Sequence, residues 1–163
     1  MNLIKLPIEF EQRMQKQLAG SFPAFAQSLT EAPPISIRYN PRKHHHPENL
    51  EKIPWSQYGR YMAERPIFTL DPLLHAGVYY VQEASSMFLE QAFLQTVDQN
   101  NPINVLDLCG APGGKSTHLL SLMNTQSLLV SNEEIRSRAF ILSENIQKWG
   151  YHNKSTPGRQ PRW

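Results

Sequence analysis

Residues 103–149 alternate the patterns of strands and helices, and this alternation limits the possible folds more than any other feature of the sequence. INVLDL (103–108) and SLLVSN (127–132) have the apolar pattern of strands, and each precedes a segment with helical spacing, 113–123 and 134–149. Strands that alternate with helices form parallel sheets with right-handed crossovers. We therefore predict an α/β fold in which INVLDL is a buried strand. Two such units are fewer than the roughly five strands of a complete doubly wound sheet.

The N-terminal part of the chain has a different composition, because most of the 13 prolines of the whole sequence precede residue 75. The pattern there predicts an amphipathic helix over 8–20, a half-buried strand over 35–40 and a polar loop over 41–60. We predict that residues 1–75 form a small α+β domain.

A second domain is expected to begin at residue 76. A strand over 77–82 and a helix over 83–97 lead into the alternating region, so we assign residues 76–153 to the first part of a Rossmann-like domain. Residues 154–163 are polar and have no periodicity, and we expect them to form a disordered tail.

Composition excludes several classes of protein. The net charge of +2 does not by itself indicate a nucleic-acid partner, and the single cysteine, Cys109, excludes an internal disulfide framework. Residues 1–14 lack the apolar core of a signal peptide, and no apolar run approaches the roughly 20 residues that span a bilayer. We expect a soluble cytoplasmic protein with no membrane contact.

The turn CGAPGGKS (109–116) resembles a phosphate-binding loop only in part. The P-loop pattern G-x-x-x-x-G-K-[ST] requires a glycine where this sequence has Cys109, and Gly110 lies one residue too late. That glycine allows backbone amides to wrap a β-phosphate. The mismatch therefore disfavours a nucleotide hydrolase.

An adenosine cofactor without phosphates is the alternative. Asp107 precedes a glycine turn that opens a helix, and Glu133 follows the next strand about 20 residues later, where a carboxylate can bind ribose hydroxyls. Taken singly, Glu133 has the alternative role of a helix-start carboxylate, and Asp107 that of a loop cap. The glycines do not follow G-x-G-x-x-G, which favours S-adenosylmethionine over nicotinamide or flavin cofactors.

VLDLCGAPGGKST (105–117) resembles the S-adenosylmethionine motif of the RsmB/RsmF and NSUN family of RNA 5-methylcytosine methyltransferases. Three further segments resemble that family in the same order: PPISIRYNPRK (33–43), VYYVQEASSM (78–87) and SNEEIRSRAFILSENIQKWG (131–150). RsmF-like members are the most similar. The resemblance implies a Rossmann-like methyltransferase domain preceded by a small substrate-handling domain, with rRNA as the partner.

The resemblance also implies a set of residues that contact S-adenosylmethionine. They are Cys109, Gly110, Ala111, Pro112, Gly113, Gly114, Lys115 and Glu133. Arg138 matches an arginine of the family to which the sequence assigns no role.

The mechanism implied by the family is nucleophilic. A cysteine thiolate adds to carbon 6 of cytosine, carbon 5 takes the methyl group, and loss of the carbon-5 proton expels the thiol. The family places two cysteines in DAPCSG-like and TCT-like motifs, and neither motif occurs in this sequence. We interpret Cys109 as a small packing residue, and we expect that this chain alone binds the cofactor weakly or not at all and does not methylate RNA. The alternative function is a non-catalytic protein that binds RNA or the cofactor.

Three cationic residues are candidates for contact with RNA phosphates: Arg38, Arg42 and Lys43. The alternative for them is an ordinary charged loop. His44–His46 point in different directions and lack accompanying cysteines or carboxylates, so we predict a solvated loop and no metal site. We expect that at least two of three nearby aromatic residues belong to the core rather than stack on bases: Trp55, Tyr58 and Tyr61.

Overall fold

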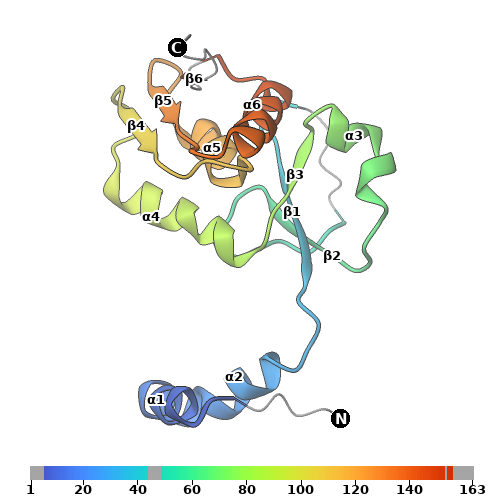
Figure 1. Ribbon diagram of the computed structural model, residues 1–163, viewed down its shortest axis with the longest axis vertical. Helices are drawn as coiled ribbons and strands as arrows, with labels where there is room; N and C mark the ends of the chain where they lie inside the picture. The colour runs from blue at the N-terminus through green and yellow to red at the C-terminus, as the bar shows by residue number, and fades with distance from the viewer. Residues whose placement is uncertain (1–5, 44–48, 153, 156–163) are drawn as a thin grey trace. The chain divides into compact units, whose positions relative to one another are not determined.

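The computed structural model describes residues 6–43, 49–152 and 154–155, and Figure 1 shows its elements. The chain divides into two compact units, Met1–Pro33 and Pro34–Trp163. The boundary at residue 75 that we infer from the sequence stays a prediction.

The first unit contains two short helices joined by a 3₁₀ turn. They are α1 (Ile8–Leu18), η1 (Ala19–Ser21) and α2 (Phe22–Ser28). The expected helix over 8–20 is confirmed as far as Leu18. It ends there because Ala19 has a positive φ of 43°. The rings of Phe10 and Phe25 lie 6.3 Å apart and bring the two helices together.

The second unit begins with an antiparallel sheet in the order β2-β1-β3. Its strands are β1 (Ile35–Tyr39), β2 (Gly59–Met62) and β3 (Tyr79–Val81). The strand expected over 35–40 is confirmed over Ile35–Tyr39, but the prediction that it is half-buried is wrong, because Ser36 and Arg38 are as buried as the neighbouring Ile37 and Tyr39. β1 is the central strand, so both of its edges are paired, and side chains on both of its faces are buried.

Residues 49–60 of the predicted polar loop include packed and paired positions. Ile53 is 2% exposed, and the bridge between Lys52 and Arg60 extends the pairing near β2. Beyond β2 lie η2 (Phe68–Leu70) and α3 (Pro72–His75). The expectation for the aromatic residues is confirmed, since all three are half-buried against core clusters: Trp55, Tyr58 and Tyr61.

The remainder of the unit alternates helices and strands, as the sequence predicts. The elements are η3 (Ser85–Phe88), α4 (Leu89–Thr96), β4 (Asn104–Asp107), α5 (Gly114–Leu122), β5 (Leu128–Ser131), α6 (Arg136–Trp149) and β6 (Lys154–Ser155). The strands form a parallel sheet in the order β4-β5-β6. Lys154 and Ser155 thus belong to a strand where the sequence predicts a tail, and residues 156–163 of that predicted tail lie outside the described residues.

The core of this region lies on one side of the parallel sheet, where α4, α5 and α6 pack together (Figure 1). Leu120 of α5 and Leu129 of β5 are fully buried there. The opposite face is open, since Leu106 and Leu108 are 59% and 65% exposed. The strand expected over 103–108 is confirmed over Asn104–Asp107, but the prediction that it is buried is wrong, because all three helices cover the same face.

Candidate cofactor site

The glycine loop (Cys109–Lys115) begins where the parallel strands β4 and β5 end side by side. Asp107 pairs with Ser131 at the last position of the ladder. Asn132 N–H then donates to the Asp107 carbonyl at 2.7 Å, and Gly110 N–H donates to the Asn132 carbonyl at 2.8 Å. The loop is therefore fixed to the carboxyl edge of the sheet, the edge at which open α/β sheets bind ligands.

Asp107 holds the two ends of this loop together. Its Oδ2 accepts a hydrogen bond from Ser116 Oγ at 2.7 Å, and its Oδ1 accepts one from Cys109 N–H at 3.3 Å. One carboxylate thus joins the exit of β4 to the first turn of α5. This geometry matches the loop-capping role that the sequence left open for Asp107.

Two glycines shape the turn for different reasons. A Cβ on Gly110 would lie 3.0 Å from Ser116 Oγ and 3.1 Å from Leu142 Cδ2, so the packing there leaves no space for a side chain. Gly113 has a φ of 113° and precedes α5, a backbone shape that other residues rarely adopt. The first-turn N–H groups of α5 cannot bond within the helix, and they favour electronegative ligand atoms.

Glu133 lies after β5 and is almost covered, with a side chain 6% exposed. Its Oε1 accepts from Ile135 N–H at 3.1 Å and lies 3.5 Å from Arg138 Nη1. No hydrogen bond to Oε2 occurs within the described part of the chain. The capping contact that we considered as the alternative role is thus present, and one carboxylate oxygen remains for a ligand.

The other side chains of the loop face different surroundings. Lys115 and Cys109 are exposed, whereas Ala111 is buried in the core between the helices. The interpretation of Cys109 as a packing residue is wrong, because its side chain leaves the turn toward solvent.

Helix α6 holds the middle of the loop through two polar side chains. Arg138 Nη2 donates to the Ala111 carbonyl at 3.0 Å, and Asn145 Nδ2 donates to the Pro112 carbonyl at 2.7 Å. Sequence reasoning missed Asn145. The available signal was its spacing of seven residues from Arg138, which places both on one face of a helix.

The structure corrects the RNA contact expected of Arg38. The residue is 1% exposed, and its guanidinium donates to Gln82 Oε1 at 2.8 Å and to Thr117 Oγ1 at 2.7 Å. Its Cζ lies 4.5 Å from the centre of the Trp149 ring. Burial lowers the pKa of Arg38 to about 9, so the group is still charged at neutral pH. It cannot reach a phosphate in solvent, and the RNA-contact prediction is wrong for this residue.

The other two candidate RNA residues lie nearer the surface. Arg42 is exposed, and its Cζ lies 3.8 Å from the centre of the Tyr151 ring. Lys43 is half-buried, and its ammonium donates to the Ala76 carbonyl and, at 2.6 Å, to the Lys148 carbonyl near the end of α6. Burial lowers the pKa of Lys43. RNA contact remains a prediction for Arg42, whereas Lys43 is already used to cap α6.

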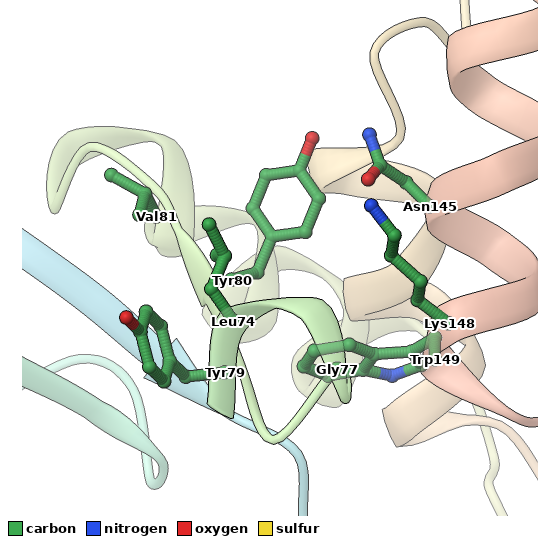
Figure 2. Close-up of a pocket in the computed structure, with 8 residues that line it drawn as sticks. All are labelled: Leu74, Gly77, Tyr79, Tyr80, Val81, Asn145, Lys148 and Trp149. Carbon is green, nitrogen blue, oxygen red and sulfur yellow. The ribbon is translucent and has the colours of Figure 1, made fainter. Parts of the chain in front are cut away.

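A pocket of about 220 Å³ lies where β3 meets the C-terminal half of α6. Figure 2 shows the polar ends of Tyr80, Asn145 and Lys148 gathered on one side of it. Asn145 joins this pocket to the glycine loop through its bond to Pro112. The loop thus packs against a partly open region on its α6 side.

A buried hydrogen bond that the sequence did not reveal, between Glu90 and His118, joins α4 to α5. Glu90 accepts from Ser56 Oγ at 2.7 Å, from Gln57 N–H at 2.9 Å and from His118 Nε2 at 3.0 Å. Burial raises the pKa of Glu90, but these hydrogen bonds outweigh burial, so the pKa is lowered overall. Burial also lowers the pKa of His118. A carboxylate and a neutral imidazole result, in which His118 Nε2 carries the proton and buried Nδ1 has no hydrogen-bond partner among the described residues.

Two classes of feature are absent from the described part of the chain. No group of three or more His, Cys, Asp or Glu side chains there is arranged to hold a metal ion. His44–His46 lie outside the described residues. Across residues 6–43, 49–152 and 154–155, no helix has the length and apolar character needed to cross a membrane.

Family profiles match most of the chain. The profile described as the N-terminal domain of 16S rRNA methyltransferase RsmF matches residues 6–84, and the profile of 16S rRNA methyltransferase RsmB/F matches residues 92–157. Ribosomal RNA small subunit methyltransferase F of Shewanella woodyi is 38% identical over 106 residues, and that of Shewanella denitrificans is 40% identical over 109. Each match covers 64% of this chain and 22% of the relative, so the chain spans less than a quarter of the length of these curated relatives.

Solved structures show the same fold. A methyltransferase homolog from Pyrococcus horikoshii superposes with a TM-score of 0.71 at 22% identity, over 93% of this chain and 56% of that one. Another solved structure covers 94% of this chain and 36% of its own, with a TM-score of 0.73 and 22% identity. The predicted fold class is thereby confirmed.

Proposed function

We propose, because the chain belongs to the RsmB/RsmF/NSUN family of RNA methyltransferases, that its glycine loop binds S-adenosylmethionine for methylation of carbon 5 of cytosine in rRNA. The curated relatives are named as ribosomal RNA small subunit methyltransferases and are much longer than the matched part. The activity and substrate of a whole enzyme therefore belong to the proposal.

The observation that supports it most is the placement of the loop and Glu133 at one edge of the parallel sheet. Gly113 turns the backbone into α5, whose first-turn N–H groups lie at that edge, and Glu133 Oε2 has no partner among the residues described. In the proposal this oxygen accepts a hydrogen bond from a ribose hydroxyl, while the backbone of Cys109–Lys115 lies against the rest of the cofactor. The cofactor, when bound, supplies the methyl group.

The geometry disfavours a nucleoside triphosphate in the same loop. A P-loop surrounds a phosphate with successive backbone N–H groups. Here Gly110 N–H is used by the Asn132 carbonyl, and Cys109 N–H points to Asp107. Two of the donors that would wrap a phosphate are thus occupied within the protein.

The second candidate is that these residues bind the cofactor or RNA without catalysis of their own. The family mechanism needs a cysteine at the cytosine, and Cys109, the single cysteine of these 163 residues, lies in the glycine loop. Arg42, exposed and stacked on Tyr151, remains the candidate for RNA contact in either case.

Photochemical cross-linking tests the proposal. Methyl-tritiated S-adenosylmethionine is irradiated with the purified chain, and the labelled peptides are mapped. We expect label in peptides that contain Cys109–Lys115 or Glu133, with competition by S-adenosylhomocysteine and none by Mg²⁺–ATP. Labelling of other peptides would contradict the proposal. So would labelling of the loop by labelled ATP that disappears in the Lys115→Ala variant. Transfer of tritium to rRNA by the chain alone would rule out the non-catalytic candidate.

A further inference from the structure

We infer that Arg138 and Asn145 are positioning residues: together they form a clamp on α6 that holds the glycine loop in its binding shape. This inference rests on the proposed function of the loop. We call these two side chains the α6 clamp. Neither needs to touch the cofactor for the clamp to act.

The clamp grips two consecutive peptide groups. Arg138 bonds the Ala111 carbonyl and Asn145 bonds the Pro112 carbonyl, at 3.0 and 2.7 Å. Seven residues make almost two full helical turns, so both side chains project from the same face of α6. The helix thus presents two donors to the loop at a fixed separation.

The loop has few other means of holding this shape. Its carbonyls at Ala111 and Pro112 belong to no helix or strand, and Pro112 has no N–H to donate. Gly113, the next residue, has a backbone that is free to adopt many conformations. Loss of the two donors would therefore leave the middle of the loop with much more freedom than its ends, which Asp107 and Asn132 fix.

Arg138 also connects the loop to the other half of the proposed site. Its Nη1 lies 3.5 Å from Glu133 Oε1 while Nη2 bonds Ala111. A planar guanidinium suits this double contact, whereas a lysine ammonium is a single point charge. One side chain thereby sets the distance between the loop and the carboxylate proposed to bind ribose.

Because Arg138 is partly exposed, its role in positioning the loop can be distinguished from a role in stabilising the whole fold. Its side chain is 49% exposed, and an ion pair of such exposure contributes little to stability. Removal of the clamp should therefore change the loop and its ligand affinity more than the folding of the core.

The experiment compares Arg138→Ala and Asn145→Ala with Arg136→Ala in the 163-residue chain. Arg136 lies at the start of the same helix, carries the same charge and lies over Phe140 rather than near the loop. Amide hydrogen exchange across residues 109–115 and the dissociation constant for S-adenosylhomocysteine are measured. Each clamp variant should speed loop exchange and weaken binding by about 3- to 10-fold, the effect of one hydrogen bond. Arg136→Ala should change neither.

Arg138→Lys supplies the conservative variant, and we expect it to restore only part of the affinity. The inference is overturned if the clamp variants match Arg136→Ala, or if exchange accelerates equally in α4 and α5, which would indicate a general structural role. Absence of cofactor binding by the unaltered chain would refute the proposed function, while exchange in the loop would still decide whether the clamp exists.

Discussion

The two three-stranded sheets of the second unit use their polar residues in opposite ways. In the antiparallel sheet, polar side chains point inward and are used by the protein itself. Arg38 bonds Gln82 and Thr117, and the Asn40 amide donates to the carbonyls of Gly77 and Trp149. In the parallel sheet, polar groups collect at the ends of the strands, where a ligand can reach them.

This difference separates residues that join parts of the fold from residues that are available for binding. Arg38 reaches from β1 to the Gly114 carbonyl at the start of α5, so it connects the first sheet to the helix of the second. Lys43, which follows β1, likewise connects the first sheet to the end of α6 through its bond to the Lys148 carbonyl. Basic residues in the first sheet are therefore a poor guide to an RNA surface, whereas loop and strand-end residues of the second are a good guide to a ligand site.

The largest expected effect comes from breaking the inner network of the first sheet. Arg38→Met removes a buried charge and leaves Gln82 and Thr117 without their donor, so we expect a loss of about 3–5 kcal/mol in the free energy of unfolding. Arg42→Met, at an exposed position, should cost no more than about 0.5 kcal/mol. Urea unfolding of both variants measures the difference, and equal losses would refute the contrast between the two cations.

A smaller loss in the free energy of unfolding is expected at Gly113, in the glycine loop at the edge of the second sheet. Its φ of 113° is strained for any residue with a Cβ, so Gly113→Ala should cost about 1–3 kcal/mol. Gly20→Ala is the control, because a Cβ there has nothing within 4 Å. Thermal unfolding of the two variants checks the prediction. A tolerated alanine at Gly113 would show that the loop does not need this backbone shape.

Glu133→Gln should affect ligand binding rather than folding. The amide keeps the shape of the side chain but loses the charge that strengthens a hydrogen bond to ribose, so we expect affinity for S-adenosylhomocysteine to fall about 10-fold. Glu134→Gln, an exposed neighbour with the same loss of charge, should leave affinity unchanged. Titration calorimetry or a competition assay compares them, and similar affinities in both variants would argue against contact between Glu133 and ribose.

The smallest expected effect is a pH dependence of stability from the pair between Glu90 and His118. Because the folded state lowers the pKa of His118, the unfolded state binds more protons near its ordinary pKa of 6.5. The contribution of His118 to the free energy of unfolding is therefore fully present well above pH 6.5, and it declines as the pH falls through that value. Because the folded state also lowers the pKa of Glu90, the free energy of unfolding continues to decline below pH 4.5.

His118→Gln should flatten the upper part of this slope, since an amide can still donate to Glu90 but does not titrate. Unfolding is followed in urea at a series of pH values between about 5 and 7.5. Arg38, the other charged group facing the imidazole, stays charged throughout this range. An unchanged slope in the variant would show that other groups govern the pH response.

The parts of the fold that the sequence predicts correctly rest on short-range patterns. Glycine turn, helix, strand and Glu133 fall within one stretch of some 27 residues, and the spacing alone places them at one edge of the sheet. Burial of Arg38 depends instead on Gln82 and Thr117, which lie 44 and 79 residues away along the chain. Alternation within ISIRY predicts a surface cation because nothing nearby in the sequence shows what covers it.

The sequence did not predict the exposed face of β4 for a related reason. The apolar run INVLDL has the pattern of a strand buried on both faces. Which face receives helices depends on the path of later segments, and here α4, α5 and α6 all pack on the side of Leu129. Asn145 was missed in the same way, because its partner Pro112 lies 33 residues earlier.

One measurement tests the central claim, that the carboxyl edge of the parallel sheet is an adenosine-cofactor site. The ¹⁵N-labelled chain is titrated with S-adenosylhomocysteine and, separately, with Mg²⁺–ATP, while backbone amide shifts are followed by NMR, which also detects weak binding. We predict saturable shifts at Gly110, Ala111, Gly113–Lys115 and Glu133 with the first ligand and none there with the second. No response to S-adenosylhomocysteine at these amides, or a response to Mg²⁺–ATP centred on Lys115, would contradict the assignment.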